Sequence, residues 1–277
     1  MQVTQLFIYP IKSLGGIEVK QSLVTQRGLQ YDRRYMLVDE NGLFLTQRTL
    51  HKMALFKLSL VDDGFVVHHE NNTIKIPFAI TGATQQVTIW EDTLEAVIAD
   101  EYYNQWFSEQ LHQPVKLVYM HQESNRPVNP KYAHHKEQLS LADGYPVLVI
   151  SEASLSFLNS KLKKPIGMDR FRPNVVISGV AAHQEDELPI FKIGTAQFKV
   201  AKPCGRCVVT TINQQTLQTG KEPLATLAKY RRVGDNVNFG ANVICLNEGH
   251  ITVGDLVCNH LKRFICLTLM FKNVFCI

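Results

Sequence analysis

The sequence has little of what marks several common protein classes. Six cysteines in 277 residues are too few for a disulfide-stapled scaffold, which favours a reducing cytoplasmic location. The net charge is only +4 and no run of lysine and arginine is present, so we expect no nucleic-acid polymer as a partner. No apolar stretch reaches the roughly 20 residues that span a bilayer, and residues 1–5 lack the basic start of a signal peptide. We therefore expect no membrane association.

Motifs for nucleotide cofactors and iron–sulfur clusters are also missing. The sequence contains no Gly-x-Gly-x-x-Gly loop and no alternation of strands with helices, which argues against a dinucleotide-binding or P-loop fold. The last three cysteines, Cys258, Cys266 and Cys276, lack the spacing of a plant-type ferredoxin cluster. If the protein is a redox enzyme, we expect its electrons to come from a flavoprotein or a ferredoxin-type protein, and not directly from NADH or NADPH.

Short apolar segments separated by turn residues predict a mainly β protein with a few helices. Strands are predicted at residues 2–9, 35–38, 56–61, 65–69, 73–76, 86–90, 94–98, 115–119, 147–150, 175–178, 190–193, 197–200, 208–212, 242–246 and 250–253, and helices at 101–112, 151–162 and 223–230. The length suits two domains. We expect a β-barrel-like domain at 1–120, a second β-rich domain at 121–258 and an apolar tail at 259–277. The polar segment 122–138 is interpreted as a linker or an active-site loop.

A Cys-x-x-Cys pair, Cys204-Gly205-Arg206-Cys207, ends one of the predicted strands. Thiolates bind soft metals, and a neighbouring guanidinium such as that of Arg206 favours the thiolate. Half of a zinc site, a thioredoxin-like redox pair and two structural cysteines stay open as alternatives. Zinc requires a second pair with finger-like spacing, which the sequence does not offer. A thioredoxin-like pair opens a helix, whereas residues 208–212 are predicted to continue as a strand.

Cationic and amide side chains elsewhere are candidates for binding an anion. Arg172 and Asn174 flank Pro173, which fixes its own φ and favours extended backbone at Arg172. Lys12 and Ser13 follow the first predicted strand and supply a point charge and a hydroxyl. Taken singly, each of these residues is also explained as part of a solvated surface.

Together these motifs resemble the MOSC family, named for the C-terminal domain of molybdenum cofactor sulfurase. They are most similar to its two-domain members with an added N-terminal β-barrel, a group that includes the mitochondrial amidoxime-reducing component. The resemblance extends over residues 1–257. It implies that Cys207 is the protein ligand of molybdenum in a molybdenum cofactor (molybdopterin), with Cys204 as a neighbour. The cofactor contacts that it implies are Lys12, Ser13, Arg33 or the adjacent Arg34, Gly144, Tyr145, Arg172, Asn174, Gly205, Arg206 and Asn242, with Arg48 as a weaker candidate.

The same resemblance implies a function. It suggests a cofactor cleft between two domains and a two-electron reduction of N-hydroxylated compounds, namely amidoximes, hydroxylamines and N-hydroxylated bases. At the level of the family it also carries an expectation of pyridoxal phosphate binding. A function of a different class stays open, that of a non-enzymatic carrier of molybdenum cofactor or of sulfur held as a Cys207 persulfide. A purely structural role is the third possibility.

Overall fold

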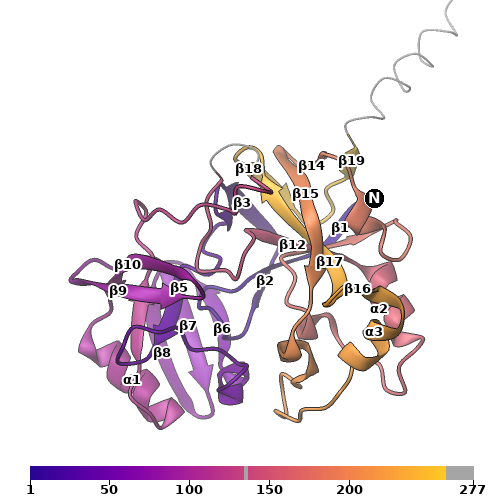
Figure 1. Cartoon of the computed structure of the whole chain (residues 1–277). Coiled ribbons are helices and arrows are strands. Elements are labelled where there is room, and N and C mark those ends of the chain that lie inside the picture. Colours follow the sequence, from indigo (N-terminus) through magenta and orange to yellow (C-terminus); the bar gives the residue numbers. More distant parts are fainter. Residues whose placement is uncertain (134–136, 260–277) are drawn as a thin grey trace, which may run out of the picture.

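The computed structural model describes residues 1–133 and 137–259, so the tail predicted at 259–277 lies almost wholly outside the described residues. Within them the chain is mainly β, with three α-helices, as predicted (Figure 1). The predicted loop at 122–138 contains no helix or strand among its described residues, apart from an isolated bridge between Pro127 and Gln138.

The largest sheet of the described chain combines strands from both ends of the sequence. Its order is β19-β14-β15-β17-β12-β13-β1-β2, with β16 paired to β17. Its strands are β1 (Gln2–Ile8), β2 (Ile17–Val19), β12 (Val147–Ser151), β13 (Val175–Ser178), β14 (Phe191–Ile193), β15 (Ala196–Gly205), β16 (Arg232–Val233), β17 (Asn236–Cys245) and β19 (Val257–Asn259). Leu6 of β1 lies opposite Val175 of β13 in antiparallel register. The first strand of the chain is therefore part of the sheet formed by the second half (Figure 1).

Three smaller sheets complete the β structure of the described residues. Their orders are β5-β11-β10-β9, β6-β7-β8 and β18-β3-β4. The strands are β3 (Gln21–Thr25), β4 (Gly28–Leu29), β5 (Tyr35–Val38), β6 (Lys57–Val61), β7 (Gly64–His69), β8 (Asn72–Pro77), β9 (Thr84–Ile89), β10 (Asp92–Ile98), β11 (Lys116–Tyr119) and β18 (Gly249–Thr252). The helices are α1 (Glu101–Leu111), α2 (Glu152–Asn159) and α3 (Leu224–Arg231), and the 3₁₀ helices are η1 (His51–Leu55), η2 (Met168–Arg170), η3 (Gln184–Glu187) and η4 (Val208–Thr211).

A hydrophobic core is shared by the two halves of the chain. One cluster of buried side chains includes Leu37 and Phe107 from the first half and Val149 and Phe191 from the second. Burial of apolar area is the main stabilising term in folding, and protein interiors are close-packed. The loops at the ends of these strands are therefore held relative to one another by a common core.

One predicted strand is wrong, at residues 208–212. Residues Val208–Thr211 form η4, which begins directly after Cys207. The hydroxyl of Thr210 donates to the carbonyl of Cys207 at 2.9 Å, and that of Thr211 donates to the carbonyl of Val208 at 2.7 Å. Such side-chain bonds to nearby carbonyls compete with strand pairing, which the β-branched composition had suggested. Because no strand continues after Cys207, the structure does not disfavour a redox pair on that ground.

Candidate functional site

All eleven predicted site residues line one cavity of about 420 Å³. They are Lys12, Ser13, Arg33, Gly144, Tyr145, Arg172, Asn174, Gly205, Arg206, Cys207 and Asn242. Arg34 lines a different cavity, so the structure brings Arg33 to the other predicted residues.

The lining of this cavity is strongly cationic. It includes six basic residues, Lys12, Arg33, Arg48, Arg172, Lys202 and Arg206, and among the residues that line it Asp143 is the one carboxylate. A concave surface with one sign of charge concentrates ligands of the opposite sign. The cavity therefore suits an anionic ligand.

Lys12 and Asp143 form an ion pair in the lining of the cavity. The Lys12 side chain is buried, and its Nζ also donates to the carbonyl of Leu141 at 3.0 Å. Burial lowers the pKa of Lys12 to about 8, although Asp143 opposes this shift. Burial also acts to raise the pKa of Asp143, but Lys12 and Arg48 hold that pKa well below its usual range. At neutral pH the carboxylate is therefore fixed as an anion, while the amino group titrates just above neutrality.

Asn174 positions Arg33. Its Oδ1 accepts from Nη1 of Arg33 at 3.1 Å, and its Nδ2 donates to the carbonyl of Phe7 in β1 at 3.2 Å. Arg33 is also ion-paired with the buried Asp32, which in turn accepts from the backbone N–H of Tyr9. Because its amide is already occupied on both sides, Asn174 acts on a ligand chiefly by holding Arg33.

Four non-glycine residues of the lining have left-handed backbone, namely Ser13 at φ 68°, Arg33 at φ 48°, Trp90 at φ 57° and Arg172 at φ 55°. This conformation is costly for residues with a side chain and is enriched at functional sites. The extended backbone predicted for Arg172 is therefore wrong. Its guanidinium lies 4.2 Å from the ring centre of Tyr9, and this tertiary contact accompanies the turn from η2 into β13. Burial lowers the pKa of Arg172 to about 10.

The two cysteines have different cationic neighbours. Nη1 of Arg206 lies 3.1 Å from the sulfur of Cys204, and not beside Cys207 as the sequence suggested. β15 ends at Gly205, and Arg206 follows it, with its guanidinium beside the sulfur of Cys204 and donating to the carbonyl of Phe171. Cys207 is exposed, and its sulfur lies 3.9 Å from Nη1 of Arg48. The guanidinium next to Cys207 thus comes from the first half of the chain.

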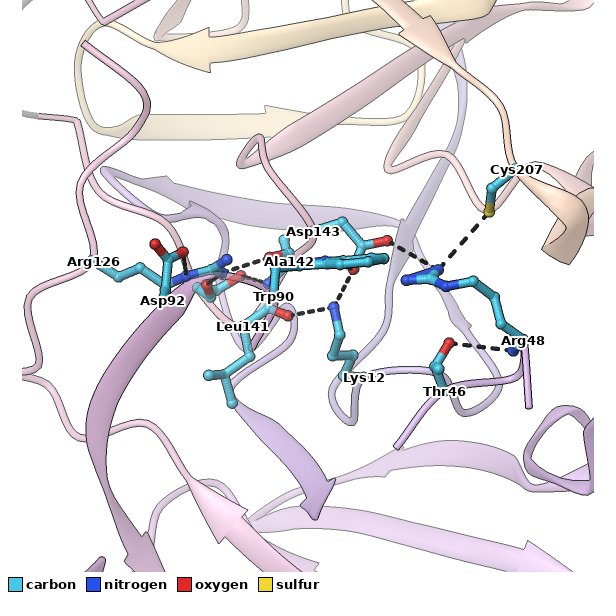
Figure 2. A network of polar contacts seen from close by, with 11 residues as sticks. Lys12, Thr46, Arg48, Trp90, Asp92, Arg126, Leu141, Ala142, Asp143 and Cys207 are labelled. Atoms are coloured by element: carbon cyan, nitrogen blue, oxygen red, sulfur yellow. Dashed lines mark hydrogen bonds and ion pairs between the residues drawn. The ribbon is translucent and has the colours of Figure 1, made fainter. Parts of the chain in front are cut away.

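Arg48, Trp90 and Asp143 form a connected group that the sequence did not predict as a unit (Figure 2). The guanidinium of Arg48 lies 4.3 Å from the Trp90 ring centre, and its Nη1 lies 3.8 Å from Oδ2 of Asp143. Nε1 of Trp90 donates to Oδ1 of Asp143 at 3.2 Å. The sequence marked Arg48 as a weaker candidate and did not predict Asp143 or Trp90 as site residues.

Lys202 and the glycines shape the remaining wall. The Nζ of Lys202, which the sequence did not predict, lies 5.1 and 5.4 Å from the ring centres of Tyr132 and Tyr145. A Cβ on Gly144 would meet no atom within 4 Å, whereas one on Gly205 would lie 2.7 Å from Asn236. The cavity is therefore open beside Gly144 and closed behind Gly205.

The donor set fits a ligand that brings its own metal-binding atoms. Within residues 1–133 and 137–259, no three His, Cys, Asp or Glu residues are grouped so that they could hold a metal. Nη2 of Arg48 and Nε of Arg206 are buried without a hydrogen-bond partner in the described chain. Buried donors are normally satisfied, and a thiolate prefers a soft metal. Unpaired donors, surplus positive charge and the Cys207 thiol fit an anionic metal cofactor.

Fold and cavity thus define a mainly β protein with a cationic, cysteine-bearing ligand cavity. Residues 1–114 match the model of the MOSC N-terminal beta barrel domain, and residues 136–258 match that of the MOSC domain. The chain is 32% identical to mitochondrial amidoxime-reducing component 1 of Homo sapiens, over 92% of this chain and 82% of the relative. It is 31% identical to molybdenum cofactor sulfurase of Oryza sativa subsp. japonica, over 92% of this chain but only 33% of the relative. The protein belongs to the MOSC-domain family, in the group that carries the added N-terminal barrel.

The described residues contain no helix that is both long enough and apolar enough to cross a lipid bilayer.

Proposed function

We propose that the protein is a molybdenum-cofactor-dependent reductase that removes oxygen from N-hydroxylated compounds such as amidoximes, hydroxylamines and N-hydroxylated bases. The observation that carries this proposal is the cavity itself. It combines the free thiol of Cys207 with six basic residues and one carboxylate. The 32% identity to a relative named for amidoxime reduction supports the choice of substrate class.

In this proposal Cys207 is the ligand of the metal, and Lys12, Ser13 and Arg33 bind the phosphate end of the cofactor. Lys12 and Arg33 suit this role because each is ion-paired and held in place before a ligand arrives. Preorganised charges lose less conformational entropy on binding than mobile ones.

In this proposal, the cavity residues from the second half of the chain contact the pterin. Arg172 and Arg206 provide guanidinium donors, while Gly144, Tyr145, Gly205 and Asn242 shape the space around the ring system. When bound, the molybdenum cofactor supplies the two-electron redox chemistry. The residues of the chain hold it, exclude other ligands and leave the Cys207 side of the cavity open to substrate.

Each cycle requires two electrons and two protons and yields the N-dehydroxylated product and water. We propose that a separate flavoprotein or ferredoxin-type protein supplies the electrons, and that the protein works in the cytoplasm, where free thiols such as those of Cys204 and Cys207 persist. Pyridoxal phosphate binding stays a prediction.

The test combines metal analysis with an activity screen. Purified protein should contain molybdenum and pterin in a one-to-one ratio to the chain, and should convert benzamidoxime to benzamidine with a chemical electron donor. Protein with a full complement of cofactor that leaves benzamidoxime and hydroxylamines unchanged would contradict the reductase proposal.

The second candidate is a carrier of molybdenum cofactor or sulfur. It is favoured by the similarity to molybdenum cofactor sulfurase, although the match covers only 33% of that relative. Cys207 would then hold a persulfide instead of a metal. Metal-free protein whose mass exceeds that of the chain by one sulfur atom, with the excess lost in Cys207→Ser, would support this candidate.

A further inference from the structure

Trp90 is a half-exposed aromatic residue in the lining of the proposed cofactor cavity. It lies in the tight turn between β9 and β10, has left-handed backbone at φ 57°, and leaves 48% of its surface open. A side chain of this size is normally more buried, and left-handed backbone is strained for it. The turn therefore presents the indole at the cavity at some cost in stability.

The indole is nevertheless held firmly in place. Its Nε1 donates to Asp143 at 3.2 Å, its ring centre lies 5.1 Å from that of Phe44, and the Arg48 guanidinium lies 4.3 Å from it. Three contacts from two segments, the loop that holds Phe44 and Arg48 and the loop that holds Asp143, fix its orientation while the remaining surface stays accessible. A rigid, half-exposed aromatic surface is suited to binding another flat group.

Arg48 connects this aromatic surface to Cys207. The same guanidinium that contacts the Trp90 ring lies 3.9 Å from the Cys207 sulfur (Figure 2). A small molecule that approaches the Cys207 side of the cavity is thus separated from the indole only by the Arg48 side chain.

The charge of the cavity restricts what the indole can bind. With six basic residues in the lining, a cationic group is repelled, although aromatic rings alone attract cations. An uncharged flat ring meets no such penalty and gains area burial and stacking. We propose that Trp90 and Arg48 form a subsite for an uncharged, planar aryl group of the substrate, an inference that rests on the proposed function for the identity of the rest of the substrate.

Binding is tested by fluorescence, which does not depend on turnover. The chain has two tryptophans, Trp90 and Trp106, so Trp106→Phe leaves Trp90 as the reporter and Trp90→Phe leaves Trp106. Benzamidoxime should quench the Trp90 reporter with saturation and leave the Trp106 reporter unchanged. Acetamidoxime, which has a methyl group in place of the ring, should quench neither. Absence of saturable quenching of Trp90, or equal quenching of both reporters, would overturn the subsite.

Kinetics then separate substrate binding from a merely structural role. In Trp90→Leu the KM for benzamidoxime should rise about 3- to 10-fold, the range expected for one aromatic contact, with kcat and the kinetics of acetamidoxime little changed. Trp90→Phe should restore most of the affinity. Leu60→Ala removes an equally exposed apolar side chain outside the cavity and is the matched control. An equal rise in KM for both amidoximes would overturn the subsite but leave the proposed function standing. Saturable quenching of Trp90 without any reduction of benzamidoxime would support the subsite but contradict the proposed function.

Discussion

The two walls of the cavity hold their charges in different ways. On the wall formed by the first half of the chain, Lys12, Arg33 and Arg48 each have a carboxylate partner. On the wall formed by the second half, the basic residues are Arg172, Lys202 and Arg206. They contact aromatic rings, a thiol or a carbonyl, and have no ion pair in the described chain.

The two walls therefore differ in how firmly their cations are fixed and in how much of their charge is left for a ligand. A cation paired with a carboxylate is fixed in position, but its charge is partly cancelled before the ligand arrives. A cation without a carboxylate partner keeps its charge available. We therefore expect the first wall to determine where an anion lies, and the second wall, with Cys207, to contribute more of the binding free energy.

The largest contrast is expected between the two cysteines of the second wall. Cys207→Ser should lose molybdenum and lower activity by more than about 100-fold, beyond the 10- to 100-fold typical of residues that only support a ligand. Cys204→Ser should keep most of both, because Cys204 is the partner of Arg206. Metal content by mass spectrometry and benzamidoxime turnover are the measurements. Equal losses from both substitutions would point instead to a dithiol or zinc site.

Removing one cation from each wall compares them directly. Arg172→Ala and Lys12→Ala should each weaken cofactor retention by about 10- to 100-fold, the loss of one charge-assisted contact. The effect of Arg172→Ala should be the larger, because Lys12 already shares its charge with Asp143.

Cofactor content after dialysis, with a thermal melt to show that each variant folds, is the measurement. Lys75→Ala breaks an exposed ion pair far from the lining and is the control. Full retention in both cavity variants would rule out the two-wall arrangement.

Phosphate affinity measured as a function of pH reports on Lys12, a cation of the first wall. Burial lowers the pKa of Lys12 to about 8, so its charge is lost as the pH rises through that value. Affinity for inorganic phosphate should fall above pH 8, by at most about tenfold per pH unit from this group. Lys12→Arg should remove the dependence, since a guanidinium stays charged.

The lowered pKa of Lys12 affects folding stability in the opposite direction from phosphate affinity. The folded pKa lies below the ordinary value of 10.5, so between pH 8 and 10.5 the unfolded chain binds more protons, and this group adds stability as the pH rises. Denaturant melts with and without phosphate distinguish the two effects. A phosphate affinity that is flat across pH 8 in the unsubstituted protein would contradict the assignment to Lys12.

The smallest effect is expected at Gly144, beside the open part of the cavity. A Cβ there meets no protein atom, so Gly144→Ala should leave the free energy of unfolding within about 0.5 kcal/mol of the original, yet reduce cofactor affinity a few-fold by occupying space. Gly220→Ala adds a methyl group to equally open space away from the lining and should change neither quantity. Unaltered cofactor affinity in Gly144→Ala would place the ligand away from this loop.

The sequence was most informative where a local pattern determines structure. Alternating and continuous apolar segments predicted most long strands and all three helices, and Ser151 accepts from the backbone N–H of Ser154 as an N-cap should. The short strands β2, β3, β4, β16 and β19 were missed, because their few residues do not form an apolar run that marks them as buried strands. The error at residues 208–212 arose because threonine hydroxyls can bond to nearby carbonyls, which β-propensity does not capture.

The site was predicted where residues lie in recognisable motifs, and missed where they meet only through tertiary packing. Arg48, Trp90 and Asp143 lie on three separate loops, and no spacing in the sequence connects them. The assignment of Arg206 to Cys207 failed because β15 ends at Gly205, and beyond a strand's end adjacency in sequence does not determine which side chains meet.

The pairing of β1 with β13 has a consequence for how the protein is made. Leu6 cannot lie beside Val175 until Val175 has been synthesised, so β1 and β13 can pair only once residues up to 178 have left the ribosome. Contacts so distant in sequence slow folding and leave apolar segments exposed in the meantime. A nascent chain arrested near residue 120 would carry β1 with β2 but without β13, which makes this chain a candidate client for chaperones that bind during translation.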